Sequence, residues 1–304
     1  MEDIISIGKT QTFRHTTNND IAKIDKLEEA LAATSTRNKT VIISFVNKAY
    51  VEGNKTTMLD VFLYGFSNGE GTRELMKHLL IVAMDGASYK RCRSLRLHCY
   101  KLETQGVDFE GEKVYMSEEF IRMMWRRTLF LGEVLQRGYN FIFTDMDVLW
   151  LRNPFPYLTT TEPELDLQIS TDKYRSAYPR VNTGFYMIRS NNKTRALFHA
   201  WYARKDTSPG LKEQDVLQAL MLRGVFRRLS LTVKFLDTLY FSGFCQDSRD
   251  PAAVATVHAN CCRGMAAKLT DLTAVLRDWK RYNVNDKMTP FRWSSHSACR
   301  KSFG

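Results

Sequence analysis

Two carboxylates interrupt an apolar stretch near the middle of the chain, in the sequence FIFTDMDVLWLRNPF at residues 141–155. Asp145 and Asp147 follow residues 141–144, whose apolar and β-favouring side chains predict a short buried strand. Burying a carboxylate is costly unless a cation or hydrogen-bond donors compensate its charge. Two carboxylate oxygens on one small patch suit Mg²⁺ or Mn²⁺, which bind a few carboxylates and complete their coordination with water and substrate phosphates. The stretch therefore predicts a metal–diphosphate site, and the alternative is a strand-end turn with two solvated acids.

Three residues are expected to hold the metal. Asp147 is the first choice for a direct ligand, whereas Asp145, which ends the strand, is expected to reach toward a ribose or toward the metal through water. His258, in ATVHANCCRG at the end of a predicted strand, could complete the set with a neutral imidazole. The alternatives for His258 are a core histidine bonded to the backbone and a zinc site with Cys261 and Cys262. Adjacent cysteines are poor zinc ligands compared with a C-x₂-C pair, which disfavours zinc.

Two basic residues suit a bound diphosphate. Lys268 begins the last predicted helix, where its full positive charge adds to the partial charge of the helix N-terminus. Arg127 falls in the apolar row of the helix predicted at 118–137, so its side chain is expected to point inward and to neutralise phosphate or orient the two carboxylates. The alternatives are a surface lysine and a structural ion pair.

A further set of polar residues could orient a sugar. The run 182–184 offers an amide side chain and a close backbone approach at the start of a strand, and the run 213–215 opens a helix with groups able to bond sugar hydroxyls. For the second run, the simpler alternative is negative charge at a helix N-terminus. The set comprises Asn182, Gly184, Glu213, Gln214 and Asp215, together with Asp172 at another strand end.

The elements that must position these residues alternate between strand and helix. Continuous apolar runs predict buried parallel strands, and apolar residues at helical spacing predict the intervening helices. The predicted strands cover 40–46, 78–85, 113–116 and 141–144, and the helices cover 56–67, 87–99 and 118–137. This order predicts a doubly wound, largely parallel α/β sheet with ligands at the carboxyl ends of its strands. Asn47, Asp85 and Asp145 all lie at such ends.

The second half of the chain is expected to complete the same sheet within a single domain. Its predicted strands cover 165–170, 182–189, 232–236 and 253–258, and its helices cover 194–204, 212–223 and 265–280. Residues 1–39 are expected to form a polar N-terminal tail or stem with a short helix, residues 40–285 the globular domain, and residues 286–304 a basic, irregular C-terminal tail.

The composition is that of a globular protein with an excess of positive charge. Of the 304 residues, 44% are hydrophobic and 25% are charged, and the net charge is +11. Such a protein attracts polyanions or phosphate-bearing substrates, but the sequence contains no nucleic-acid-binding module. It also lacks a P-loop, a G-x-G-x-x-G turn after a strand and a G-x-S-x-G nucleophile motif, which leaves metal-assisted diphosphate chemistry. No apolar run approaches the roughly 18–20 residues of a membrane span.

The six cysteines are even in number, which permits disulfide pairing in an oxidising compartment but does not require it. Cys92 and Cys99 share a face of the helix predicted at 87–99, two turns apart. That separation is too large for a disulfide within a regular helix, so a bridge between them would need a break in the helix.

A family resemblance is carried by WRRTLFLGEVLQRGYN followed by FTDMDVLWLRNPF, and then by NTGFYMIRSN, KEQDVL and VHANCCRG. In this order, and over roughly residues 40–285, these motifs resemble the plant nucleotide-diphospho-sugar transferases of glycosyltransferase family 77. The resemblance implies a GT-A fold, which has a mixed, mainly parallel sheet flanked by helices. It also implies a UDP-sugar donor, Mn²⁺ or Mg²⁺, and transfer with retention at the anomeric carbon. The implied location is the Golgi lumen, as a type II membrane protein whose anchor is not present in this sequence.

The same resemblance assigns roles to individual residues. It implies that Asp145, Asp147 and His258 bind the metal, and that Glu213 and Gln214 correspond to an Asp-Gln pair near the sugar. Glutamate stands here where related enzymes have aspartate. The candidate catalytic residues are therefore Glu213, Gln214 and Asp215. The candidate residues for binding the donor are Asn47, Asp85, Arg127, Asp145, Asp172, Asn182, Gly184 and Lys268.

The resulting prediction is a metal-dependent glycosyltransferase that moves a sugar from a UDP-sugar to a cell-wall polysaccharide or a glycoprotein. One alternative is a catalytically silent protein of the same fold that binds a carbohydrate or a nucleotide. Another is a nucleotidyltransferase that makes the sugar nucleotide. That enzyme would need a glycine-rich basic loop after the first strand, and VNKAYVEGNKTT at residues 46–57 lacks one.

Overall fold

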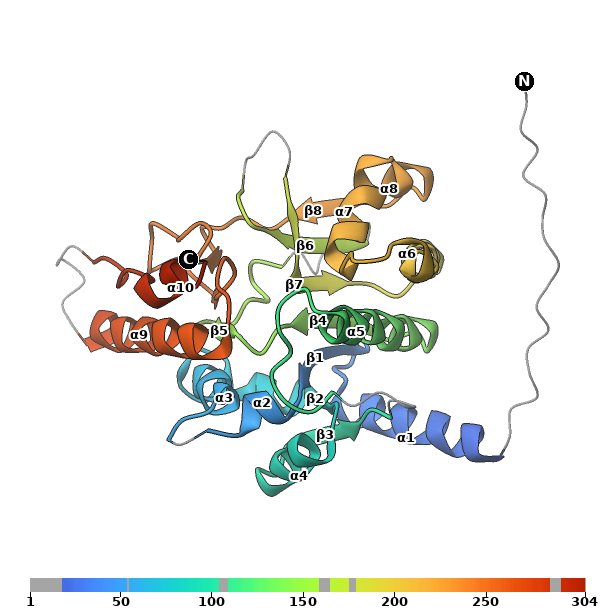
Figure 1. Cartoon of the computed structure of the whole chain (residues 1–304), viewed down its shortest axis with the longest axis horizontal. Coiled ribbons are helices and arrows are strands. Elements are labelled where there is room, and N and C mark those ends of the chain that lie inside the picture. The colour runs from blue at the N-terminus through green and yellow to red at the C-terminus, as the bar shows by residue number, and fades with distance from the viewer. Residues whose placement is uncertain are drawn as a thin grey trace.

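A mixed sheet forms the centre of the computed structural model, which describes residues 18–53, 55–103, 109–158, 165–174, 179–284 and 291–303. Its seven strands follow the order β3-β2-β1-β4-β7-β6-β8 (Figure 1). The first four are parallel, whereas β7 is antiparallel to both of its neighbours. A smaller sheet has the order β5-β10-β9. The strands are β1 (Thr40–Val46), β2 (Leu79–Ala83), β3 (His98–Lys101), β4 (Asn140–Thr144), β5 (Val148–Trp150), β6 (Leu167–Thr171), β7 (Val181–Ile188), β8 (Val233–Phe235), β9 (Phe241–Gly243) and β10 (Thr256–His258).

Helices cover both faces of the main sheet, so the predicted α/β class with a mainly parallel sheet is confirmed. Within β1, Val41 and Ile43 belong to a core that also contains residues of α1, α5, α6 and α7. The intervening Ile42 belongs to a second core, together with residues of α3 and α9. The α-helices are α1 (Asn18–Thr34), α2 (Lys48–Val51), α3 (Met58–Asn68), α4 (Gly86–Ser94), α5 (Glu118–Gln136), α6 (Asn192–Tyr202), α7 (Glu213–Leu222), α8 (Val225–Arg228), α9 (Met265–Val284) and α10 (Ser297–Lys301).

The strand that follows the two central acids is fixed by Trp150, which is fully buried at the end of β5. Its ring stacks on Phe66 of α3 with a centroid separation of 4.6 Å. Its indole N–H donates to the hydroxyl of Thr144, the last residue of β4, at 3.2 Å. The turn between β4 and β5 is therefore held at both ends by contacts within the core.

Two predictions of secondary structure are wrong. Residues 113–116 form no strand, because Val114, Tyr115 and Met116 are exposed and lie in a turn. The edge strand of the parallel half is instead β3, formed by residues 98–101. The helix predicted at 87–99 ends at Ser94, since Arg96 adopts a positive φ of 56°.

All six cysteines are paired, as Cys92–Cys99, Cys245–Cys261 and Cys262–Cys299. The early end of α4 supplies the break that the first bridge needs, because Cys99 lies in β3 rather than in the helix. The pairing also removes Cys261 and Cys262 as zinc ligands for His258.

The C-terminal residues 291–303 are packed against the domain, contrary to the expectation of an irregular tail. Cys299 lies in α10 and is bonded to Cys262, and the indole N–H of Trp293 donates to the carbonyl oxygen of Ser248 at 3.2 Å. The imidazole of the buried His296 lies 2.8 Å from a carboxylate oxygen of Asp247. The domain limits at residues 40 and 285 stay a prediction. Within the described ranges, no helix has both the length and the apolar character that crossing a bilayer demands.

The packing of Trp150 predicts that Gly69 cannot carry a side chain. Gly69 has an ordinary φ of −70°, but a Cβ there would lie 2.5 Å from the carbonyl oxygen of Trp150 and 2.7 Å from that of Gly65. We expect Gly69→Ala to lower the free energy of unfolding by about 1–3 kcal/mol through overpacking, as measured by urea denaturation. The control is Gly86→Ala, where a Cβ meets no atom within 4 Å. Equal stability of the two variants would contradict this account of the packing.

Candidate metal and donor site

The two acids lie in the turn between β4 and β5, at the carboxyl end of β4. The backbone of this turn is held from two sides. The N–H of Asp145 donates to the carbonyl oxygen of Gly184 in β7 at 2.7 Å, and the carbonyl oxygen of Asp147 accepts from the N–H of Ala259 at 3.0 Å. Because Ala259 directly follows β10, these bonds join the main sheet to the small sheet beside the acids.

The three residues predicted to bind a metal lie together. Asp145, Asp147 and His258 each offer one ligand atom, and these atoms lie within 4.8 Å of one another. Two carboxylate oxygens and one imidazole nitrogen form a donor set that fits Mn²⁺ or Mg²⁺ and leaves coordination positions for water and phosphate. The residues present therefore suit the metal that the sequence predicts.

Positive charge from α9 and β10 surrounds the buried carboxylate of Asp147. One of its oxygens lies 2.7 Å from the ammonium of Lys268, and the other lies 3.3 Å from Nε2 of His258. Burial alone would raise the pKa of Asp147, but Lys268 and His258 outweigh burial and hold this pKa well below its usual range. In turn, burial works against the charged forms of His258 and Lys268, and Asp147 raises the pKa of each. Asp147 is thus an anionic group that faces cations.

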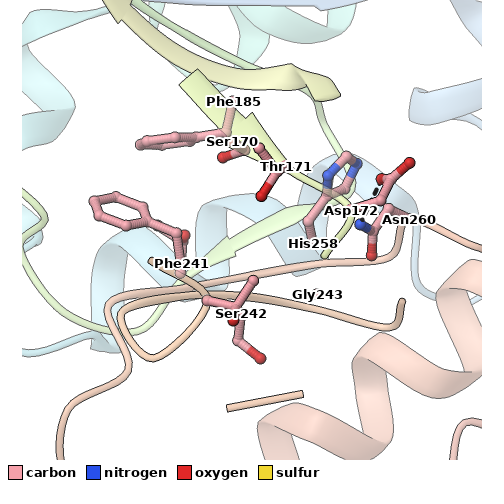
Figure 2. A pocket seen from close by; sticks show the side chains of 11 residues that line it. Ser170, Thr171, Asp172, Phe185, Phe241, Ser242, Gly243, His258 and Asn260 are labelled. Carbon is pink, nitrogen blue, oxygen red and sulfur yellow. Dashed lines mark hydrogen bonds between the residues drawn. The ribbon is translucent and has the colours of Figure 1, made fainter. Parts of the chain in front are cut away.

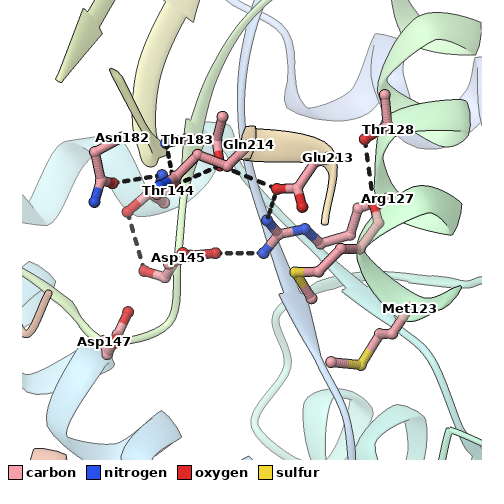
Figure 3. A network of polar contacts seen from close by, with 12 residues as sticks. Met123, Arg127, Thr128, Thr144, Asp145, Asp147, Asn182, Thr183, Glu213 and Gln214 are labelled. Carbon is pink, nitrogen blue, oxygen red and sulfur yellow. Dashed lines mark hydrogen bonds and ion pairs between the residues drawn. The ribbon is translucent and has the colours of Figure 1, made fainter. Parts of the chain in front are cut away.

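Arg127 connects the acidic turn to α7, as Figure 3 shows. Its guanidinium lies 2.5 Å from Oδ1 of Asp145 and 3.2 Å from Oε1 of Glu213, and it stacks over Phe143 at 4.7 Å from the ring centroid. The predicted inward direction of Arg127 is confirmed, since only 8% of the residue is exposed. Burial alone would lower the pKa of Arg127, but Asp145 and Glu213 raise it above its usual range. Arg127 forms the ion pair that was its alternative role, and one of its partners is a candidate metal ligand.

The first residues of α7 contact the N-terminal half of β7. The hydroxyl of Thr183 donates to Oε1 of Glu213 at 3.0 Å, and the N–H of Thr183 donates to the side-chain oxygen of Gln214 at 3.1 Å. The second carboxylate oxygen of Glu213 is buried and has no hydrogen-bond partner among the described residues. Asp215 lies one residue further along the same helix and is half-buried.

Gly184 lies directly against the candidate metal ligands His258 and Asp145. A Cβ at this position would lie 2.3 Å from Cε1 of His258 and 2.8 Å from Oδ2 of Asp145. Gly184 is fixed by its N–H, which donates to the side-chain oxygen of Asn182 at 2.8 Å. The absence of a side chain at Gly184 is what allows the imidazole and the carboxylate to approach each other.

Asp172 accepts hydrogen bonds from two amide side chains, and Figure 2 shows one of them, Asn260, beside Asp172 and His258. Asn182 donates to Oδ1 of Asp172 at 2.8 Å, and Asn260 donates to the same oxygen at 3.1 Å. The side-chain oxygen of Asn260 accepts from the N–H of Cys245 at 3.1 Å. These bonds fix the segment that follows His258 relative to β6 and β7.

The two candidates at the ends of β1 and β2 have structural partners. The side chain of Asn47 accepts from the N–H of Ala49 at the start of α2 and donates to the carbonyl oxygens of Phe109 and Gly111. Asp85 caps α4 by accepting from the N–H of Ser88 at 2.8 Å, and it also accepts from the N–H of Lys48 at 2.6 Å. Both residues lie at the predicted edge of the sheet. Their binding of a donor remains a prediction.

Three residues near the site are missing from the sequence-based set, namely Tyr50, Thr183 and Asn260. Burial raises the pKa of Tyr50 to about 12, with Lys268 lowering this pKa and Asp147 raising it. No spacing rule identifies Tyr50, because it lies in the short helix α2. Thr183 lies next to Gly184 in sequence, and Asn260 lies two residues after His258. This closeness to predicted site residues is the signal by which the sequence could have identified them.

The close approach at Gly184 predicts a selective loss of metal binding. Gly184→Ala should displace the imidazole of His258 or the carboxylate of Asp145. We expect the affinity for Mn²⁺ to fall by about 10–100-fold, as for other changes that misplace metal ligands. Calorimetric titration with Mn²⁺ measures this fall. Gly132→Ala is the control, because a Cβ there makes only ordinary contact with Phe198 at 3.5 Å. Equal affinities of the two variants would contradict the site.

The ion pairs of Arg127 predict a specific loss of stability. Arg127→Met leaves Asp145 and the buried Glu213 without their cation, and we expect the free energy of unfolding to fall by about 3–5 kcal/mol. Adding Glu213→Gln should restore part of this loss, because it removes one of the unpaired charges. The control on the same helix is Arg122→Met, which breaks an exposed pair with Glu118 and should cost less than about 1 kcal/mol. Similar losses for Arg127→Met and Arg122→Met in urea denaturation would show that the buried network is unimportant.

Comparisons of the sequence with known proteins identify the family. The family model described as nucleotide-diphospho-sugar transferase matches residues 74–272. Two uncharacterized proteins of Arabidopsis thaliana are similar, one with 53% identity over 96% of this chain and 89% of its own length, the other with 38% identity over 95% and 77%. The beta-arabinofuranosyltransferase RAY1 of Arabidopsis thaliana is 28% identical over 71% of this chain and 41% of its own length.

Among solved structures, a complex of the galactosyltransferase LgtC has a TM-score of 0.44 and 16% identity, and the match covers 76% of this chain and 94% of that one. This likeness is too distant to inform the site. The family model covers most of the chain, and the two Arabidopsis relatives match nearly all of it. The chain therefore belongs to the nucleotide-diphospho-sugar transferase family.

Proposed function

We propose that the protein transfers a sugar from a UDP-sugar to a polysaccharide or glycoprotein acceptor, in a metal-dependent reaction that retains the configuration at the anomeric carbon. Membership in a family of nucleotide-sugar glycosyltransferases supports the reaction class. Uridine as the base, and retention, rest on the resemblance of the sequence motifs to family 77.

One observation carries this proposal. Asp145, Asp147 and His258 offer ligand atoms within 4.8 Å of one another, and Lys268 and Arg127 lie against the same carboxylates. A diphosphate needs both a divalent cation and further positive charge. When bound, the metal would supply Lewis-acid stabilisation of the charge on the departing UDP.

The two basic residues have different roles in this proposal. The side chain of Lys268 is 27% exposed. In this proposal its ammonium contacts a phosphate oxygen while it remains beside Asp147. It adds fixed positive charge where the leaving group becomes more negative. Arg127 is enclosed between Asp145 and Glu213. We assign it a positioning role, because it keeps the acidic turn and the start of α7 in fixed relation.

The sugar of the donor is proposed to lie beside the first residues of α7 and the N-terminal half of β7. Glu213, which is buried, would hold the start of α7 in place for the sugar through its contacts with Arg127 and Thr183. Gln214 and Asp215, on the same helical turn, and Asn182, near the start of β7, would orient the ring. Asp172, which holds Asn182, would complete this side of the site.

The proposed location is the Golgi lumen. The pairing of all six cysteines supports an oxidising compartment, because structural disulfides form and persist in such compartments. The acceptor would then be a secreted polysaccharide or a glycoprotein that passes through the same compartment.

The metal assignment predicts the behaviour of Asp147→Asn. This change keeps the shape of the side chain but removes the charge that binds the cation. We expect Mn²⁺-dependent hydrolysis of UDP-sugars to fall by at least about a hundredfold, which corresponds to several kcal/mol of stabilisation by the metal. Asp206→Asn is the control, because the side chain of Asp206 is 89% exposed. The measurement is release of UDP across a panel of UDP-sugars. Unchanged turnover by Asp147→Asn would rule out the metal assignment.

Calorimetry with UDP distinguishes the enzyme from a silent protein of the same fold. The enzyme should bind UDP more tightly with Mn²⁺ than without it, and Asp147→Asn should remove the difference. Metal-independent binding of UDP, together with no turnover of any UDP-sugar, would support the silent alternative.

A further inference from the structure

An alternating row of rings and cations lies on the surface beside the site. We call it the aromatic–cationic ridge, and it consists of Lys212, Tyr115, Arg263 and Phe303. The ammonium of Lys212 lies 5.3 Å from the ring centroid of Tyr115. The guanidinium carbon of Arg263 lies 5.5 Å from the same centroid and 4.7 Å from that of Phe303. Four side chains from separate segments thus form one continuous surface.

The ridge is exposed, and its apolar character is unusual for this protein. Tyr115 is 44% exposed and Phe303 is 50% exposed. Six large hydrophobic side chains are exposed among the described residues, and five of them belong to the ridge or are next to one of its residues in sequence. Clustered exposure of this kind marks interaction surfaces, whereas scattered exposure does not. The five are Val114, Tyr115, Met116, Leu211 and Phe303.

The backbone around Tyr115 is held in a conformation that presents its ring. The N–H of Ser117 donates to the carbonyl oxygen of Val114 at 2.9 Å, which closes a turn with Tyr115 and Met116 at its centre. Met116 has a φ of 66°, in the left-handed region that is costly for a bulky residue. Such strain concentrates at functional sites, where it is retained for a purpose. The backbone strain at Met116 is therefore consistent with a turn that keeps Tyr115 at the surface.

The segments of the ridge are the same ones that build the site. Lys212 immediately precedes Glu213 in the chain. The segment before Tyr115 is the green loop that leads into α5 in Figure 1, and its Glu112 accepts from the N–H of Met265 at the start of α9, at 2.7 Å. That helix also carries Lys268. A long ligand on the ridge would thus lie next to the donor site.

We propose that the ridge binds the acceptor, and that the acceptor is a polysaccharide whose sugars carry carboxylates. This inference rests on the proposed glycosyltransferase activity. Lys212 and Arg263 lie over the rings of the ridge, and the parts of Tyr115 and Phe303 that stay exposed offer apolar surface against which the C–H groups of sugar rings can pack. A guanidinium between two rings keeps its N–H groups free at the edge for bidentate contact with a carboxylate. The net charge of +11 attracts a polyanion over a longer range.

Polygalacturonate and its carboxyl-reduced form are matched probes for this proposal, since they share a backbone and differ in charge. Affinity electrophoresis of the purified chain measures binding to each. We expect tighter binding to polygalacturonate, and a loss of about two- to fivefold for Tyr115→Ala and for Arg263→Gln. Tyr115→Phe and Arg263→Lys should retain more of the binding. The controls are Leu222→Ala and Arg227→Gln, at exposed positions away from the ridge, and both should bind as the wild type does.

Two results would overturn the proposal. One is equal binding of the charged and the carboxyl-reduced polymer. The other is unchanged binding of polygalacturonate by Tyr115→Ala and Arg263→Gln. That result would also be expected if the ligand of the protein were another protein or a nucleic acid bound elsewhere. UDP release without polysaccharide separates this proposal from the proposed function. If the ridge variants release UDP normally but bind polygalacturonate as the wild type does, only the acceptor surface is wrong. If no metal-dependent release occurs in any form of the protein, the glycosyltransferase activity itself is wrong.

Discussion

The site depends on the compensation of two acids by positive charge from distant parts of the chain. A carboxylate as enclosed as Asp147 is costly unless charge or hydrogen bonds surround it, and Lys268 and His258 provide both. Asp145 receives its partner from α5 in the form of Arg127. The pairs of Asp147 also fix the backbone, because they join the turn between β4 and β5 to β10 and α9 from the second half of the chain. In the proposed function, the contacts that stabilise the fold are also the ones that would hold the metal and the diphosphate.

A change of strand direction creates the space for these contacts. β4 lies between β1, which is parallel to it, and β7, which is antiparallel. At the carboxyl end of β4 the chain therefore meets residues near the amino end of β7, and Asp145 lies opposite Gly184. Ligands of α/β proteins gather where the order of a sheet changes in this way. The small sheet then brings His258 to the same place through its pairing with β5.

Much of this arrangement could be predicted from the sequence, because its signals are local. Ser117 caps α5 and Gly138 follows its end with a positive φ, as their residue types indicate. The inward direction of Arg127 followed from helical spacing. The strand at 98–101 was missed, because its side chains are mostly exposed and lack the pattern of a buried strand. The contacts of Thr183 and Asn260 with α7 and Asp172 depend on register and tertiary packing, which local periodicity does not encode.

The adjacent cysteines have a consequence for the biogenesis of the protein. Cys261 and Cys262 each pair with a different partner, Cys245 and Cys299. While its disulfides form, the chain therefore contains two adjacent thiols that can exchange partners. Such an exchange would shift the segment that follows His258 by one residue. Correct pairing depends on thiol–disulfide exchange, which lets the native isomer accumulate through the stability of its packing. Production of active protein should therefore respond to the supply of a disulfide isomerase as well as to the presence of an oxidant.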